Sequence, residues 1–127
     1  PIKSSAASDV YKRQAVDVDS GRDVGGGALN RINEEAAYEI ARQIRLRNLA
    51  GKIVIDFAGH SEYKYIKPLL EILERELAKD SIKSHVAGLS RAGLVEIIRV
   101  RRRPSLSELM TEECPTCNGT GRVEKGA

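Results

Sequence analysis

The spacing of apolar residues in this chain alternates between strand-like and helix-like periods, and this order restricts the fold more than any other feature. The strand-like segments are residues 15–19, 52–57, 85–89 and 94–100. Helix-like spacing separates the first from the second and the second from the third. The segment 52–57 is a short apolar run, which is typical of a buried central strand. This alternation predicts an α/β fold with a sheet of about four strands.

Three helices are expected between and after these strands. Asn30 or Asn33 is suited to cap the first helix, whose apolar residues recur at helical spacing. The second helix covers roughly residues 68–79, with Pro68 in its first turn, where a missing N–H does no harm. A short helix at 105–110 leads into a turn that contains two cysteines.

The length and composition of the chain exclude several classes of protein. With 127 residues it has the size of about one domain. It contains no apolar run near the ~20 residues that span a bilayer, and no signal-peptide pattern. We therefore expect a cytoplasmic protein without a transmembrane segment. With no Trp and one Phe, aromatic platforms for stacking bases are not expected, so contact with nucleic acid would be mainly electrostatic.

The first fourteen residues are interpreted as foreign to the protein. Residues 4–14 resemble the translation of an adapter used in sequencing libraries, and such segments are excluded from fold reasoning. Residues 1–14 contribute +2 of the net charge of +3, so about +1 is left for the remainder. The high pI therefore gives little support for a nucleic-acid partner. We expect the gene to continue upstream of Ala15, with one truncated domain at 15–104 and a separate C-terminal part at 105–127.

Two aspartates occupy the ends of strand-like segments. Asp17 lies in the first and Asp56 in the second, and strands joined by one helix tend to be parallel neighbours. Both carboxylates would then lie at one edge of the sheet, where open α/β sheets bind ligands. Two carboxylates can hold Mg²⁺, which activates water and neutralises charge at a phosphodiester. The alternative is structural, because an Asp that ends an apolar strand is common.

The two cysteines, Cys114 and Cys117, form a Cys-x-x-Cys turn rich in Pro and Gly. A structural zinc ion takes four ligands in a tetrahedron, and this turn supplies two of them. The chain has no second pair, and neither histidine has zinc-finger spacing. If Zn²⁺ binds here, the other two thiolates come from another molecule, so the pair predicts a homodimer that shares one zinc ion.

A basic stretch follows the last strand-like segment. Arg99, Arg101, Arg102 and Arg103 are candidates for contact with the phosphate backbone of a nucleic acid. Lys83, just before another strand, is a further candidate. A charge run is more often a solvated strand end than a binding site, and this alternative stays open.

Several motifs in order make the chain similar to the ribonuclease E/G family. Val16-Asp17-Val18-Asp19-Ser20-Gly21 resembles that family's Asp-x-Asn-Ser-Gly motif. The other matching segments are residues 33–37, 39–47, Ile55-Asp56-Phe57, Gly93-Leu94-Val95-Glu96, Arg103-Pro104-Ser105-Leu106 and Cys114-Pro115-Thr116-Cys117. The resemblance extends from Ala15 to Val123.

This resemblance implies a Mg²⁺-dependent endoribonuclease of RNA processing and decay, which cuts single-stranded RNA, favours AU-rich segments and leaves a 5′-phosphate. It implies that Asp17 and Asp56 hold the catalytic metal. It also implies that Cys114 and Cys117 share one Zn²⁺ with the same pair of a second subunit, in a homodimer or a dimer of dimers. The fold implied is a deoxyribonuclease-I-like subdomain, truncated at its N-terminus, followed by a zinc link.

The chain departs from the family pattern at several positions. Asp19 replaces the usual Asn and adds a carboxylate that either tightens metal binding or repels phosphate. Gly59 stands where another acid is frequent. Lys83 stands where relatives carry an Arg that senses the RNA 5′ end, and Lys loses the bidentate fork. Since the family's S1-type RNA-binding domain and 5′-sensing region would lie upstream, we expect this chain alone to be poorly active or inactive.

Two other functions remain as alternatives. A non-catalytic, zinc-linked dimerisation module would require Cys114 and Cys117 but neither Asp17 nor Asp56. A chaperone-type zinc ribbon is the second, because Cys-x-x-Cys-x-Gly-x-Gly also occurs in such repeats. Those repeats need several copies, and this chain has one.

Overall fold

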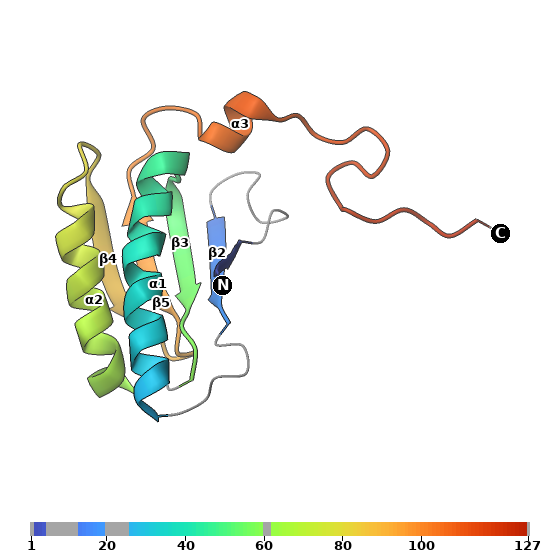
Figure 1. Cartoon of the computed structure of the whole chain (residues 1–127). Helices are drawn as coiled ribbons and strands as arrows, with labels where there is room; N and C mark the ends of the chain where they lie inside the picture. Colours follow the sequence, from blue (N-terminus) through green and yellow to red (C-terminus); the bar gives the residue numbers. More distant parts are fainter. Residues whose placement is uncertain (1, 5–12, 20–25, 60–61, 127) are drawn as a thin grey trace.

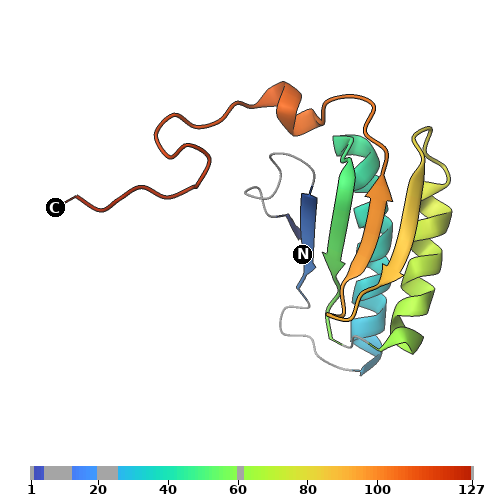
Figure 2. The same ribbon diagram turned by 180° about the vertical axis from the view of Figure 1, so that it is seen from behind.

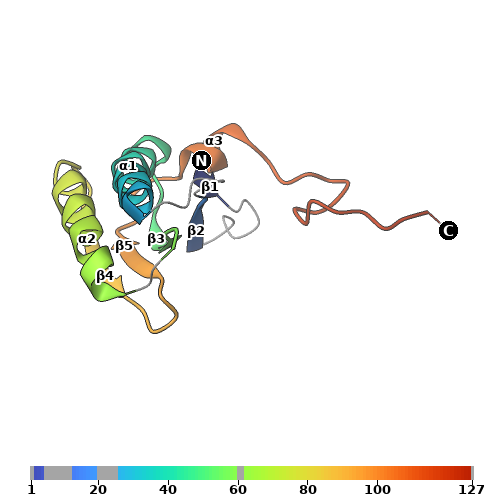
Figure 3. The same ribbon diagram turned by 60° about the horizontal axis from the view of Figure 1, so that its bottom comes forward.

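The fold has two layers, a sheet and a pair of helices packed on one of its faces (Figure 1). The computed structural model describes residues 2–4, 13–19, 26–59 and 62–126. Helix α1 spans Gly26–Arg47 and helix α2 spans Tyr63–Leu77. Viewed towards one end, both helices lie on the same side of the strands (Figure 3). The α/β class predicted from the alternating periodicity is therefore confirmed.

Within the described ranges the sheet has five strands, in the order β1-β2-β3-β5-β4. Their bounds are β1 Ile2–Ser4, β2 Arg13–Val18, β3 Gly51–Asp56, β4 Ser84–Leu89 and β5 Val95–Arg99. The four predicted strands correspond to β2, β3, β4 and β5. The short β1 adds an antiparallel edge next to β2, so part of the segment interpreted as an adapter translation pairs with the sheet.

Helix α1 connects β2 to β3, and these two strands are parallel neighbours. Helix α2 connects β3 to β4, and β5 returns between them, antiparallel to both. Strands β3 and β4 therefore point the same way with β5 inserted between them. Periodicity predicts the strands but not the insertion of β5, because the insertion depends on pairing between segments that are distant in sequence.

Helix α1 begins at Gly26, which is earlier than the expected cap at Asn30 or Asn33. Both asparagines lie inside the helix, so that expectation is wrong. The side chain of Asn33 bonds instead to the backbone of Ala58, across the interface with the end of β3. Ser20 and Gly21, which end the motif that begins at Val16, are among residues 20–25, which lie outside the described parts of the chain.

The C-terminal end of α1 is closed by a Schellman motif. The N–H of Asn48 donates to the carbonyl of Arg45 (3.2 Å), and the N–H of Leu49 donates to that of Ile44 (3.0 Å). Asn48 has a φ of 51°, a left-handed conformation that Asn tolerates better than most residues. Leu49 and Ile44 are both buried, which is the apolar contact that usually accompanies this motif.

Helix α2 begins at Tyr63, so Pro68 lies inside the helix, and the prediction that places it in the first turn is wrong. Its ring removes the N–H that would bond to the carbonyl of Lys64. Both residues are exposed, so this loss falls on the solvent side of the helix. The opposite side carries the buried residues Ile66, Leu69, Leu70, Ile72, Leu73 and Leu77.

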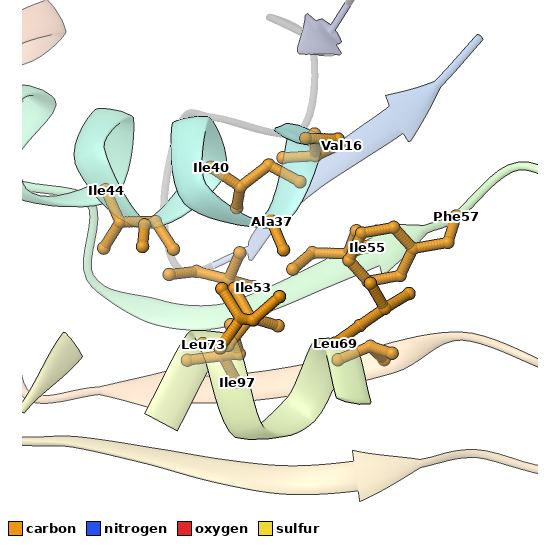
Figure 4. Close-up of a cluster of buried hydrophobic side chains, with 14 of the residues drawn as sticks. Val16, Ala37, Ile40, Ile44, Ile53, Ile55, Phe57, Leu69, Leu73 and Ile97 are labelled. Carbon is orange, nitrogen blue, oxygen red and sulfur yellow. The ribbon is translucent and has the colours of Figure 1, made fainter. Parts of the chain in front are cut away.

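The core lies between the helices and one face of the sheet. Figure 4 shows side chains of α1 and α2 meeting those of β3, where Ile53 and Ile55 are fully buried. Lys52 and Asp56, on the other face of β3, are exposed. The prediction that this strand is central is confirmed, but it is buried on one face instead of two. The reason is that neither α1 nor α2 covers the second face, which Figure 2 shows from behind.

The C-terminal part begins with the short helix α3 (Leu106–Met110), close to its predicted bounds. Ser105 and Glu108 form a capping box at its start. After α3 the chain runs away from the sheet (Figure 1). Among the helices of the described residues, none is both long and apolar enough to cross a membrane.

The small residues of α1 set how closely this helix approaches the sheet. Ala37 is fully buried and points towards Ile53 and Ile55 (Figure 4). We expect Ala37→Leu to lower the free energy of unfolding by about 1–3 kcal/mol, because the core has no space for the added carbons. Urea denaturation measures the effect against Glu35→Leu, an exposed change on the same helix. Equal stability of the two variants would contradict this packing.

Candidate functional site

Asp17 and Asp56 lie side by side at the C-terminal ends of the parallel strands β2 and β3. They are register partners, and neighbouring strands are about 4.8 Å apart. Val16, Val18 and Ile55 face the core, so alternation along each strand directs both aspartates to the uncovered face. Both are exposed. Their placement at one edge of the sheet is as the sequence predicted, and their role remains a prediction.

The number of oxygen donors at this edge suits an open magnesium site. Magnesium is commonly held by one or two carboxylates, with water and phosphate oxygens completing its shell. Asp17 and Asp56 supply such a pair. Asp19, which directly follows the last residue of β2, is also exposed. Within the described residues no three His, Cys, Asp or Glu side chains gather closely enough to hold a metal ion. The residues present therefore fit Mg²⁺ that keeps most of its shell open to water and substrate.

The backbone just beyond Asp56 is fixed by a side chain from α1. The amide nitrogen of Asn33 donates to the carbonyl oxygen of Ala58 (2.9 Å), and the N–H of Ala58 donates to the Asn33 amide oxygen (3.0 Å). Asn33 is 6% exposed. The sequence analysis assigned Asn33 to a helix cap and not to this contact, although a signal for burial was present. Asn33 precedes Ala37 by four residues and Ile40 by seven, so it is a polar residue on the buried stripe of the helix.

The basic stretch lies at the opposite edge of the sheet from the two aspartates. Arg99 pairs with Gly51, the first residue of β3, whereas Asp56 is the last. Five residues of strand separate these edges by roughly 17 Å. Lys83 lies at the basic edge too, because its carbonyl accepts from the N–H of Val100 (3.1 Å). The structure therefore does not bring the basic candidates and the carboxylates together.

Arg99 is a structural residue, so our expectation that it faces a phosphate backbone is wrong. It is 2% exposed, and its Nε donates to Asp80 Oδ2 (2.9 Å). Its Nη1 donates to Asn48 Oδ1 (2.9 Å) and to the carbonyl of Leu49 (2.7 Å). The side chain thus joins the end of β5 to the C-terminal ends of both long helices. Alternation along β5 places it on the core side, together with Val95 and Ile97.

The other basic candidates remain at the surface. Arg101 forms an ion pair with Glu108 Oε2 (2.6 Å), which ties the basic stretch to the first turn of α3. Arg102, Arg103 and Lys83 are exposed. The carbonyl of Arg103 accepts a hydrogen bond from the Asn48 amide (3.3 Å), so its backbone, but not its guanidinium group, is held by α1.

Cys114 and Cys117 lie in a tight turn that favours the thiolate form. The N–H of Asn118 donates to the carbonyl of Cys114 (2.8 Å), and Asn118 and Gly119 both have positive φ values. Backbone N–H groups of Cys117 and Thr116 point at the Cys114 sulfur and lower the pKa of this thiol below its usual range. Both cysteines are free thiols. Because a thiolate is the form that binds metals, the turn is suited to supply two ligands.

Comparison with known proteins matches most of the chain to one family. The model of the "Ribonuclease E/G family" matches residues 14–102. Ribonuclease G of Escherichia coli strain K12 is 43% identical over 113 residues, covering 86% of this chain and 23% of that protein. Ribonuclease E of the same strain is 40% identical, covering 86% of this chain and 11% of its own length. Ribonuclease E of Haemophilus influenzae is 40% identical, with 97% of this chain and 14% of that protein covered. The chain thus spans less than a quarter of these relatives.

The ion pair between Arg99 and Asp80 makes the free energy of unfolding depend on pH in the acid range. Burial raises the pKa of Asp80, but the hydrogen bonds from Arg99 and the Ile82 N–H, with the charges of Arg99 and Arg45, outweigh it and hold the pKa below 3.8. A carboxylate with a lowered pKa contributes stability above its unfolded-state pKa, and this contribution is lost as pH falls through the folded-state pKa.

We therefore expect Asp80→Asn to cost about 3 kcal/mol of unfolding free energy at pH 7, because it leaves a buried guanidinium without its counter-charge. The cost should shrink progressively below about pH 4. Urea denaturation at several pH values measures it, with the exposed Glu71→Gln as control. A cost that does not change with pH would contradict the assigned pair.

Proposed function

Because the chain belongs to the ribonuclease E/G family, we propose that it carries the metal-holding carboxylates of an endoribonuclease that cuts single-stranded RNA. The observation that supports this most directly is the register of Asp17 against Asp56 on parallel strands, with both side chains exposed. The chain spans 23% of Ribonuclease G of Escherichia coli. Cleavage is therefore proposed for the full-length protein, and this chain alone is proposed to be poorly active or inactive.

In this proposal the two carboxylates act as ligands and not as proton carriers. Asp17 and Asp56 would hold Mg²⁺ through their oxygens, and their strand register keeps them adjacent before the metal binds. When bound, the ion supplies an activated water and neutralises charge on the phosphodiester. The uncovered sheet face leaves both aspartates open to a strand of RNA.

The surroundings of the two aspartates are assigned as follows. The sheet with α1 and α2 is proposed to be the deoxyribonuclease-I-like subdomain of the family, working in the cytoplasm. The exposed side chains of Arg102, Arg103 and Lys83 are proposed to contact RNA phosphates away from the cut, since they lie at the other edge of the sheet. Asp19 is an accessory carboxylate in this proposal.

A second function, a zinc-linked dimerisation module, is supported by the cysteine turn. The lowered pKa of Cys114 and the pair of free thiols suit a half-site for Zn²⁺. Two chains would complete the four-thiolate shell of a structural zinc ion. This homodimer is compatible with the nuclease, since the turn and the aspartates lie in different parts of the chain. A dimer of dimers would need further contacts.

Replacement of either aspartate tests the nuclease. In the full-length protein we expect Asp17→Asn and Asp56→Asn each to reduce cleavage of a single-stranded RNA by at least about 100-fold, because each removes a charged ligand. Circular dichroism and the melting temperature should stay close to those of the unaltered protein, since both side chains are exposed. The matched control is Glu96→Gln, an exposed carboxylate on β5. Cleavage at the original rate in both Asp variants would refute the metal assignment.

Replacement of one cysteine tests the zinc link. Native mass spectrometry of this chain should show two copies with one Zn²⁺, and Cys114→Ala should give monomers without zinc, because two thiolates no longer complete a tetrahedron. Addition of a chelator should have the same effect as the substitution. Thr116→Ala keeps both thiolates and serves as the control. A zinc-free dimer that survives Cys114→Ala would rule out the shared ion.

A further inference from the structure

The amide of Asn33 pairs with both backbone groups of a single residue, Ala58, which lies 25 positions away. Such a two-point pair uses the side-chain oxygen as acceptor and the side-chain nitrogen as donor at once. Asn33 is buried, so breaking the pair would leave polar groups without partners away from water. These two hydrogen bonds therefore fix the segment that follows β3 against α1.

The Asn33–Ala58 pair lies just beyond the last residue of β3, Asp56. The ladder between β3 and β5 ends with Ile55 opposite Val95, one residue before Asp56. Beyond Asp56, Phe57 is anchored in the core, and Ala58 bonds to Asn33. Asp56 is therefore held by its pairing with Asp17 on β2 and, from its C-terminal side, by Phe57 and the Asn33 pair.

A second contact joins the same two segments. Gly59 has a φ of 81°, and a Cβ built on it would lie 3.0 Å from a methyl carbon of Leu29. Leu29 lies in the first turn of α1, close to Asn33. The N-terminal part of α1 thus packs against the two residues that follow Phe57. Because α1 also begins at the end of the connection from β2, it is the element that links the carboxyl ends of both Asp-bearing strands.

We propose that Asn33 is a positioning residue that fixes the backbone of Asp56, so that its carboxylate and that of Asp17 are arranged for a divalent cation before it binds. This inference rests on the proposed metal-holding role of the two aspartates. Asn33 touches neither the cation nor RNA in this assignment. It acts through Ala58 on the carboxylate two residues earlier, and partners of this indirect kind commonly change metal affinity by about 10–100-fold.

The test measures binding of Mn²⁺ to this chain by electron paramagnetic resonance, because carboxylate sites that suit Mg²⁺ also suit Mn²⁺. We expect Asn33→Ala to weaken binding about tenfold. Asn33→Asp keeps the acceptor for the Ala58 N–H but loses the donor, so its affinity should lie between. Glu35→Ala, an exposed change on the same helix, should leave binding unchanged. Folded Asn33 variants that bind Mn²⁺ as tightly as Glu35→Ala would overturn the inference.

A measurement on the unaltered chain avoids variants that fail to fold. If formation of the Asn33–Ala58 hydrogen bonds increases the affinity for the cation, binding of the cation must favour formation of these bonds by the same factor. Hydrogen exchange of the Ala58 amide should therefore slow by about tenfold when Mg²⁺ is near saturation. The amide of Leu109, in α3, provides the reference within the same sample. An Ala58 rate that does not change with Mg²⁺ would also overturn the inference.

Failure of this inference is distinct from failure of the proposed function. If Asp56→Asn abolishes Mn²⁺ binding while Asn33→Ala has no effect, only the positioning role is wrong. If Asp56→Asn and the unaltered chain bind Mn²⁺ equally, the metal site itself is wrong, and the inference falls with it. In the full-length protein, higher Mg²⁺ should restore cleavage by Asn33→Ala but not by Asp56→Asn.

Discussion

The parallel pairing of β2 with β3 is the interaction on which the candidate site depends. A slip of one residue would turn every side chain of β2 to the other face and move Asp17 into the core. Such a slip is opposed by Val16 and Val18, which are buried in the core. The same apolar residues that pack the core therefore also set the register that places Asp17 beside Asp56. The geometry of the site follows from hydrophobic alternation along the two strands.

The opposite edge of the sheet is organised by a buried charge. Arg99 connects Asp80, Asn48 and the carbonyl of Leu49, so the ends of α1, α2 and β5 share one guanidinium group. The amide of Asn48 then donates to the carbonyls of Arg103 and Pro104. A buried ion pair adds little net stability over an apolar pair, but its geometry is restrictive. Here it determines the direction in which the chain leaves β5 towards α3 and the cysteines.

Local patterns account for most of what the sequence predicted. The strand positions and the helix after Ser105 follow from alternation and from capping residues within a few positions of each other. The functions of Asn33 and Arg99 did not emerge, because their partners are distant in sequence: Ala58 is 25 residues from Asn33, and Asn48 is 51 from Arg99. Arg99 was judged by its basic neighbours, whereas alternation with Val95 and Ile97 already indicated the core side. The predicted position of Pro68 in a first turn is wrong for a different reason. A helix tolerates an internal proline when the lost backbone hydrogen bond lies on its solvent side.

Each of the two candidate metal positions in this chain supplies only part of the ligand shell of its metal ion. Asp17 and Asp56 offer two carboxylates, and Cys114 and Cys117 offer two thiolates, so each position needs donors from elsewhere. Oxygen donors can come from water and phosphate, which suits a site that must exchange its substrate. Thiolate donors come from protein, which suits a permanent link. The carboxylates are held in a rigid sheet, whereas the thiols lie on a segment that extends away from it (Figure 1). An extended segment can meet a second copy without moving the sheet, so joining subunits need not disturb the edge that carries the aspartates.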